Sequence, residues 1–197
     1  METQEKVWDK IAPEWHEYKQ VPAEHTIKFL KKQKGNVLDL GSGSGRHLAK
    51  IKNGKMFLVD FSKEMINLAK QKAKRLKIPA EFAVADLTSL PYEDNFFDSA
   101  IAISSIHCLS KKCQLKAVRE LFRVLKPRAQ AEIGVWNIKS KRFKNSPKEK
   151  YIAWTNKGKR YYYLFDEKEI HDLFKKAGFK ILSSHNSEMM INFIVEK

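Results

Sequence analysis

Short apolar runs alternate with amphipathic runs along this chain, and the alternation continues from about residue 36 onward. Seven runs have the length and the β-branched or aromatic content that are typical of strands: NVLDLG, KMFLVD, EFAVAD, DSAIAIS, AEIGVW, FKILSS and INFIVEK. The segments between them with helical periodicity are residues 46–52, 62–76, 111–125 and 166–177. Strand and helix in alternation predict a parallel sheet with helices on both of its faces.

Two further segments stand outside this repeat. Residues 7–34 predict two helices separated near Pro22, and we expect residues 1–34 to form a helical cap. Residues 138–160 are basic and poor in hydrophobic residues, so we expect an insert before the last predicted helix. We find no internal repeat, and 43% hydrophobic residues suffice for a core, so a single domain over residues 1–197 is predicted.

The chain carries a formal net charge of +15 at pH 7. Such an excess favours phosphate-bearing partners, although a generally lysine-rich proteome is an alternative explanation. No stretch approaches the roughly 18 apolar residues of a membrane span and no export signal is visible, so we expect a cytoplasmic protein without a membrane partner. Cys108 and Cys113 have no second ligand pair nearby, so we expect two reduced thiols and no metal site.

The turn after the first predicted strand is rich in glycine. The stretch VLDLGSGSGRHL places Gly41, Gly43 and Gly45 within five positions. Without Cβ atoms this backbone can bend through positive φ and lie against a ligand, and the free N–H groups of the following helix would face an anion. Arg46 and His47 follow the last glycine, which excludes a nucleotide P-loop and fits a dinucleotide fingerprint poorly. A carboxylate or a phosphate is therefore the expected anion.

Acidic residues end three successive predicted strands beside this turn. Asp39 ends the first strand, where it would accept a hydrogen bond from an ammonium group of the ligand. Asp60 ends the second, 19 residues beyond Gly41, where a carboxylate binds both hydroxyls of a ribose. Asp86 ends the third, and Leu87 beside it would pack on a purine ring. Amino acid, ribose and adenine together predict S-adenosylmethionine as the cofactor, although each acid alone is more typical of a helix cap or a turn.

Nearly the whole chain resembles class I S-adenosylmethionine-dependent methyltransferases, in the segments VLDLGSGSGRHL, VDFSKEMINLAKQKA, ADLTSLPYEDNFFDSAIAISSIHCLS, ELFRVLKP and AGF. The resemblance implies an α/β, doubly wound, Rossmann-like fold with a seven-stranded, mostly parallel sheet. Its last strand would be antiparallel, and INFIVEK would form it. The predicted cofactor contacts are Asp39, Gly41, Ser42, Gly43, Gly45, Arg46, Asp60, Phe61, Asp86, Leu87 and Ser104.

Shorter segments are similar to the tRNA wobble-uridine methyltransferases that esterify a 5-carboxymethyl group: VWDKIAPEWHEYK, SIHCLS and KRYYYLFDEKEI. This resemblance implies catalytic, substrate-side roles for Lys19, His107 and Arg160. It also implies tRNA, bound through its anticodon loop, as a partner, and a small zinc-binding activator subunit as another. A carboxylate nucleophile is already an anion at neutral pH and needs no strong base, so His107 would orient the substrate. The alternatives are a structural His107 and ordinary surface charges at Lys19 and Arg160.

The chain departs from this narrower family at several positions. Lys19 stands where the family usually has Arg, Cys108 where it has a second His, and Tyr163 where it has His. KPRA replaces the common KPGG, and the C-terminal NSEMMINFIVEK lacks an Asn-Trp pair. None of these positions is a predicted cofactor contact, so methyl transfer remains the prediction and the uridine substrate is left open.

Residues 138–160 contain nine Lys or Arg against one Glu, with Phe143, Tyr151 and Trp154 among them and Tyr161–Tyr163 following. Cations bind phosphates and aromatic faces stack on unpaired bases, which favours a single-stranded loop of RNA. A flexible basic loop whose aromatic residues fold into the core is the alternative. Two other functions also stay open: a small-molecule methyltransferase of the quinone or metabolite type, and a tRNA- or partner-binding module without activity.

Overall fold

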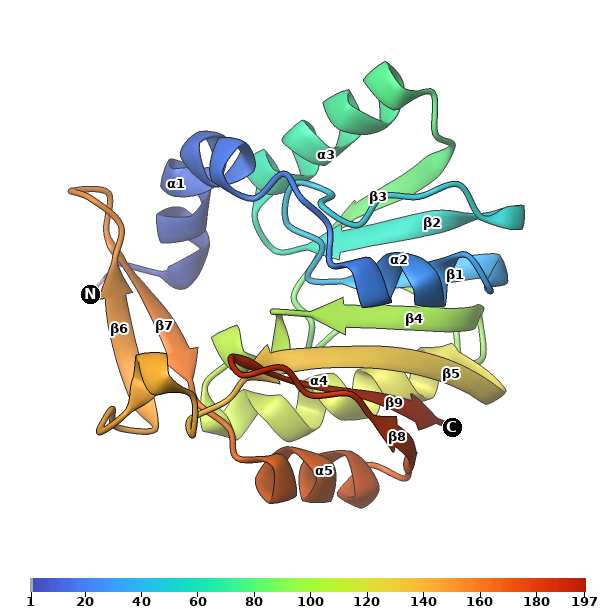
Figure 1. The fold of residues 1–197 in the computed structure, drawn as a ribbon. Coiled ribbons are helices and arrows are strands. Elements are labelled where there is room, and N and C mark those ends of the chain that lie inside the picture. Colours follow the sequence, from blue (N-terminus) through green and yellow to red (C-terminus); the bar gives the residue numbers. More distant parts are fainter. Residues whose placement is uncertain (1) are drawn as a thin grey trace.

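The computed structural model describes residues 2–197 and arranges seven strands in one sheet, in the order β3-β2-β1-β4-β5-β9-β8 (Figure 1). The strands are β1 Lys34–Leu40, β2 Lys52–Asp60, β3 Ala80–Val84, β4 Phe97–Ile103, β5 Leu125–Trp136, β8 Lys180–Ser184 and β9 Met190–Glu196. Neighbouring strands are parallel except at β9, which pairs antiparallel with both β5 and β8. The predicted seven-stranded, mostly parallel sheet with an antiparallel last strand is confirmed.

The central strands are apolar because both of their faces are covered. In β4, Ala100 and Ala102 join the core on one face, whereas Ile101 and Ile103 join the core on the other. The chain places β2 on one side of β1 and β4 on the other, so the strand order reverses beside β1. A crevice for a ligand is expected at the carboxyl ends of strands at such a switch point.

Five α-helices surround the sheet: α1 Gln4–Tyr18, α2 Glu24–Leu30, α3 Lys63–Leu76, α4 Lys111–Val124 and α5 Glu167–Lys176. Helices α4 and α5 pack on one face, and α2 and α3 pack on the other (Figure 1). The helix after the second strand is capped as predicted, since the Ser62 hydroxyl accepts a hydrogen bond from the Met65 N–H at 3.1 Å. Within residues 2–197, no helix has the length and apolar character to cross a membrane.

The helix predicted at residues 46–52 is wrong. Residues 41–50 form turns and an irregular segment, and β2 begins at Lys52. The apolar spacing that suggested a helix instead anchors this segment to the core, where Leu48 and Ile51 are buried. Seven residues are also too few to form a stable helix unless tertiary packing supports it. The N–H groups that were expected to face an anion therefore do not come from a helix N-terminus.

The basic insert contains a β-hairpin that the sequence analysis missed. It consists of β6 Glu149–Ala153 and β7 Lys159–Tyr163, after a short 3-10 helix at Lys141–Phe143. The hairpin packs against α1 (Figure 1). There the Gln4 side chain donates a hydrogen bond to the Lys159 carbonyl at 3.1 Å and accepts one from the Tyr161 N–H at 2.7 Å. Together α1 and the hairpin form a second layer beside the carboxyl ends of the strands.

Candidate active site

One pocket lies at the carboxyl ends of β1, β2 and β4 and extends to α1 and β7. It encloses about 1100 Å³, including the part that is open to solvent. Most of the residues predicted to bind cofactor or substrate line it: Lys19, Gly41, Ser42, Gly43, Arg46, Asp60, Phe61, Asp86, Leu87, Ser104 and His107. Asp39, Gly45 and Arg160 lie outside this lining.

The glycine turn forms one wall of the pocket. Gly41 has φ +74°, and a Cβ added there would lie 2.3 Å from the Ser105 Cβ. Gly43 has φ +52°, and a Cβ there would meet only the Met65 sulfur at 3.9 Å. The absence of a side chain at Gly41 therefore serves packing, whereas its absence at Gly43 leaves bare backbone toward the cavity. Gly45 packs away from the pocket, against β2 and α3.

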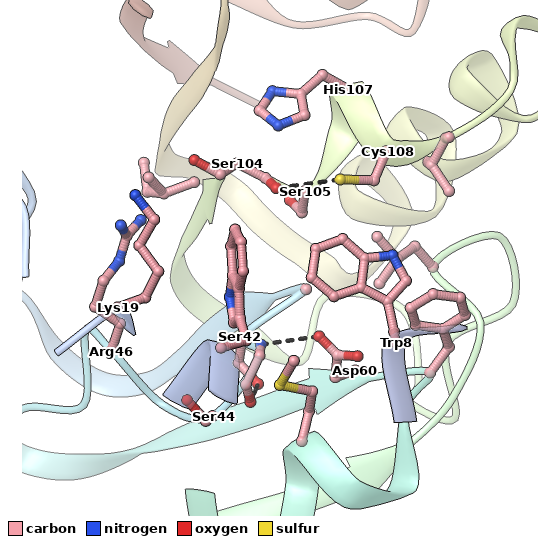
Figure 2. Close-up of a pocket in the computed structure, with 18 of the residues that line it drawn as sticks. Trp8, Lys19, Ser42, Ser44, Arg46, Asp60, Ser104, Ser105, His107 and Cys108 are labelled. Atoms are coloured by element: carbon pink, nitrogen blue, oxygen red, sulfur yellow. Dashed lines mark hydrogen bonds between the residues drawn. The ribbon is translucent and has the colours of Figure 1, made fainter. Parts of the chain in front are cut away.

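Asp60 fastens this turn to the end of β2. Its Oδ2 accepts from the Gly43 N–H at 2.8 Å (Figure 2), and its Oδ1 accepts from the Ser62 N–H at 3.0 Å. Burial raises the pKa of Asp60 to about 6, and these backbone hydrogen bonds oppose that rise. The carboxylate at the second strand end thus has a structural role besides the ribose contact that the sequence predicts.

Asp39 lies beneath the turn and is almost completely buried. Its Oδ2 has no hydrogen-bond partner among residues 2–197. Burial raises the pKa of Asp39 to about 7, although Arg46 nearby opposes the shift. A carboxylate in this position lacks a donor or a cation, which is what the ammonium group of a bound amino acid would supply.

The wall at the end of β3 is formed by Phe61, Asp86 and Leu87. Asp86 is exposed, and its Oδ1 accepts from the Thr88 N–H at 2.7 Å, so the second carboxylate oxygen remains available. Leu87 is buried beside it. This pairing of an exposed acceptor with an apolar side chain fits a purine ring. The bare turn, the unpartnered Asp39 and this wall together fit S-adenosylmethionine.

Ser104 follows β4 with φ +63°, a conformation that a residue with a Cβ rarely adopts. Two hydrogen bonds hold it there: its N–H donates to the Gly134 carbonyl at 2.8 Å, and its carbonyl accepts from the Cys108 thiol at 3.6 Å. Strained backbone of this kind is concentrated at functional sites, because it needs support from the surrounding structure. Burial raises the pKa of Cys108 to about 12, so this thiol is neutral and does not act as a nucleophile.

His107 is only 1% exposed; its ring stacks on Trp136 and lies tilted against Tyr162, while Trp136 and Tyr162 also stack on each other. Its Nδ1 accepts a hydrogen bond from the Trp136 N–H at 2.9 Å. Burial lowers the pKa of His107 to about 3, so the ring is neutral and carries its proton on Nε2. This nitrogen is a hydrogen-bond donor at the pocket wall and is not a base.

Two cations predicted on the substrate side occupy different positions. Lys19 is the C-cap residue of α1 and lines the pocket beside Arg46 (Figure 2). Arg160 lies behind the lining, 5% exposed, and donates to the Tyr162 hydroxyl at 2.8 Å. Both side chains lie near the Trp15 ring, with the Lys19 Nζ 5.8 Å and the Arg160 guanidinium carbon 5.0 Å from its centroid.

Apart from Phe61, the sequence analysis did not assign the aromatic residues of the lining to the site; they are Trp8, Trp15, Trp136 and Tyr162. Trp8 and Trp15 project from α1 with their ring centroids 5.2 Å apart. Their spacing of seven residues, two helical turns, was a visible signal that they share one helix face. No sequence pattern indicated that Trp136 would reach the pocket. Its position at the end of β5 depends on how β5 pairs with β4, which only the folded structure shows.

Comparison with known proteins also indicates methyl transfer from S-adenosylmethionine. Residues 37–128 match the protein family described as "Methyltransferase domain". The chain is 33% identical over 136 residues to the tRNA (carboxymethyluridine(34)-5-O)-methyltransferase of Arabidopsis thaliana, covering 66% of this chain and 32% of that protein. The chain likewise spans only 32% of the length of the mammalian relatives that it matches first, which are named "Probable tRNA methyltransferase 9B".

A relative of similar length is the tRNA (carboxymethyluridine(34)-5-O)-methyltransferase of Schizosaccharomyces pombe, with 26% identity over 208 residues, 90% of this chain and 88% of that protein. Among solved structures, the fold matches a methyltransferase of Haloferax volcanii in complex with the Trm112 methyltransferase activator. The TM-score is 0.72 at 17% identity, covering all of this chain and 98% of that one. Residues 37–128 therefore belong to an S-adenosylmethionine-dependent methyltransferase domain, whose cofactor is S-adenosylmethionine, and residues 2–197 have the Rossmann-like methyltransferase fold around it.

Proposed function

We propose that this methyltransferase acts on tRNA and converts the carboxylate of a 5-carboxymethyl group on a wobble uridine into its methyl ester. Relatives with that activity in their names match the chain at 26–33% identity. The observation that carries the proposal is the environment of Arg160, a buried cation beside the pocket without an acidic partner.

The Arg160 guanidinium is surrounded by aromatic rings instead of carboxylates. Its central carbon lies 4.9 to 5.8 Å from the ring centroids of Trp8, Trp15, Trp154 and Tyr162. Within residues 2–197 it forms no salt bridge, and its Nε has no hydrogen-bond partner. Cation–π contacts only partly replace the hydration that burial removes, so a buried guanidinium of this kind is stabilised further by an anion. A substrate carboxylate would supply that anion.

Three further cations, Lys19, Arg46 and Arg142, stand at this corner, and the lowered pKa of Lys19 reflects its cationic neighbours. It is lowered first by burial and then by Arg46, Arg142 and Arg160. Neither Lys19 nor Arg142 forms a salt bridge among the described residues. Cations that are held together without a counter-charge repel one another, and a bound carboxylate or phosphate relieves that repulsion.

The neutral His107 fits a carboxylate substrate. When bound, S-adenosylmethionine supplies an electrophilic methyl group on its sulfonium. The substrate carboxylate is already ionised at neutral pH, so no residue of the chain needs to remove a proton. The Nε2–H of His107 would donate to one carboxylate oxygen and leave the other aligned for attack. Burial lowers the pKa of His107 and raises the pKa of Cys108, so neither side chain acts as a base, which agrees with this chemistry.

The insert supports contact with RNA through its charges more than through its aromatic residues. Phe143 and Tyr161–Tyr163 are buried, so they belong to the core, as the alternative in the sequence analysis expected. Tyr151 is 49% exposed and remains available for stacking on bases, whereas the half-buried Trp154 packs against Trp15, Tyr18 and the Arg160 guanidinium. Among residues 2–197, the side chains of four exposed cations of the insert form no salt bridge and complete the surface: Lys139, Lys141, Arg142 and Lys144.

We also propose a small activator subunit as a partner. The support is the fold match to the Haloferax volcanii methyltransferase that is seen with such an activator. Copurification with a tagged copy of this chain from its own cells tests this partner. Recovery of the chain alone, at full activity, would contradict it.

The function is tested with tRNA whose wobble methyl esters have been removed by mild alkali. We expect methyl label from S-adenosylmethionine to enter this tRNA and to be released as methanol by renewed alkali treatment. Transcripts with an unmodified uridine should accept no label. Arg160→Gln should lower methyl transfer, whereas Arg160→Lys should retain part of it.

A small-molecule methyltransferase remains the second candidate, because the aromatic lining would also hold a planar small acid. Label that resists alkali, or label that survives nuclease digestion as a small molecule from cell extract, would favour this second function and contradict the tRNA ester.

A further inference from the structure

We propose a second ligand site, separate from the methyl-transfer pocket: a Zn²⁺ site formed by His25, Glu132 and His185. The His25 Nδ1 lies 2.8 Å from the Glu132 Oε1, and the His185 Nε2 lies 3.1 Å from the same oxygen. The three ligand atoms all lie within 4.8 Å of one another. None of these residues lines the methyl-transfer pocket.

The fold brings together residues that are far apart in the sequence. His25 belongs to α2, Glu132 to β5, and His185 to the connection between β8 and β9. His25 is 107 residues from Glu132, and Glu132 is 53 residues from His185, so no short sequence motif predicts the cluster. Glu132 pairs with Ile101 across β4 and β5 and thus lies on the sheet face that α2 covers. The His185 N–H donates to the Asn192 carbonyl at 2.8 Å, which holds the connection against β9.

The carboxylate of Glu132 is incompletely satisfied. Glu132 is only 1% exposed, and the two histidine nitrogens both lie within hydrogen-bond distance of the same carboxylate oxygen, Oε1. The other oxygen, Oε2, is buried and has no hydrogen-bond partner among residues 2–197. A buried charge of this kind is costly unless it is paired or coordinates a metal. A divalent cation bound through Oε1 would neutralise the carboxylate and remove the cost of the buried charge.

The donor set is suited to Zn²⁺. Two imidazole nitrogens and one carboxylate oxygen form a three-residue zinc set in which water takes the fourth position. Tetrahedral bonds of about 2.0–2.1 Å place ligand atoms about 3.3 Å apart. The two observed nitrogen–oxygen distances, 2.8 and 3.1 Å, would widen slightly on binding. The two histidine nitrogens, which lie within 4.8 Å of each other, would move closer together. Mg²⁺ and Ca²⁺ prefer oxygen ligands alone. The side chains of His25 and His185 are 36% and 33% exposed, which leaves a path for the ion and its water.

Such an ion would tie α2 to the antiparallel end of the sheet. Because the three ligands meet only in the folded chain, Zn²⁺ would bind the native state selectively and stabilise it. Its role would be to fix the helix that connects α1 to the sheet, and no part in methyl transfer is assigned to it.

The test uses the full chain, freed of metal with a chelator and then titrated with Zn²⁺. We expect one ion per chain by elemental analysis and a melting temperature that rises with Zn²⁺ concentration. Co²⁺ in its place should give the visible absorption of a tetrahedral site, without the near-ultraviolet band of a thiolate ligand. His25→Ala and His185→Ala should each weaken binding by more than about tenfold, since even outer-shell changes at metal sites cost that much.

His16→Ala, at a half-buried histidine of α1 outside the cluster, is the matched control and should bind Zn²⁺ as the parent does. Melting of the metal-free variants shows whether they fold, and Glu132→Gln provides a further variant that keeps the side-chain volume. Less than one ion per chain, or equal affinity in the parent and in folded His25→Ala and His185→Ala, would overturn the proposal. Either outcome would leave the cluster as two histidines hydrogen-bonded to a buried glutamate.

Discussion

The imidazole of His107 lies against the indole of Trp136, with their ring centroids 4.8 Å apart and their planes at 28°, and it accepts the backbone N–H of the same residue. This contact commits Nδ1 to the fold and fixes the proton on Nε2. One ring can therefore serve the structure through one nitrogen and a substrate through the other. The two roles that were alternatives in the sequence analysis do not exclude each other.

The two roles can be separated by substitution. His107→Asn keeps an acceptor near the position of Nδ1 and removes the Nε2–H, so it should lower the rate of methyl transfer by about tenfold or more with little loss of stability. His107→Ala should in addition destabilise the fold by about 1–3 kcal/mol, because the buried Trp136 N–H loses its acceptor. Single-turnover rates and thermal unfolding measure these effects. Equal rates in His107→Asn and the parent would contradict a role toward the substrate.

The raised pKa of Asp39 predicts a pH effect on stability. The native cofactor-free protein keeps a proton on Asp39 up to about pH 7, whereas an unfolded Asp releases it near pH 4. The contribution of Asp39 to stability is therefore lost as pH rises from about 4 to 7. Asp39→Asn should remove this part of the pH dependence, which denaturant unfolding at several pH values would detect.

The same carboxylate should respond to the cofactor. An ammonium group placed near Asp39 favours its charged form, so binding of S-adenosylmethionine near pH 6.5 should release protons. Calorimetry in buffers of different ionisation enthalpy measures that release. An identical release in Asp39→Asn would show that another group is responsible.

Alanine substitutions at Gly41 and Gly43 should have different effects on stability and on cofactor binding. Gly41→Ala forces a Cβ against Ser105 and strains φ, so it should destabilise the protein by about 1–3 kcal/mol or prevent folding. Gly43→Ala meets open space and should retain more stability while it weakens cofactor binding. Thermal unfolding and calorimetry of both variants test this order. A Gly41→Ala protein as stable as Gly43→Ala would refute the packing argument.

The basic insert should contribute to the salt dependence of tRNA binding. Replacing Lys139, Lys141, Arg142 and Lys144 with Gln should weaken binding and make the slope of log affinity against log salt shallower, by roughly 0.7–0.9 for each phosphate that is no longer neutralised. Cofactor affinity should not change. The matched control replaces four exposed cations of α3 and its C-cap with Gln: Lys70, Lys74, Arg75 and Lys77. Equal slopes for the two quadruple variants would show that the insert does not face RNA.

The sheet and the cofactor end of the pocket were predictable because they depend on local patterns. Alternating apolar runs define strands, and a parallel order follows from the helices between them. Residues at the ends of consecutive strands then meet at one edge of the sheet, so Asp39, Asp60 and Asp86 could be grouped from their positions alone. The resemblance to methyltransferases supplied the strand count and the antiparallel last strand.

What depends on contacts between distant residues had to come from the tertiary structure. Residues 46–52 have a helical pattern, yet the packing of Leu48 and Ile51 into the core holds them in an irregular segment. The hairpin of β6 and β7 was hidden in a basic sequence, because its stability comes from contacts with α1, more than 130 residues away. The aromatic surroundings of Arg160 and the cluster at Glu132 were hidden for the same reason. The sequence by itself determined which residues share a strand or a helix face, whereas only long-range packing decided which of these faces meet.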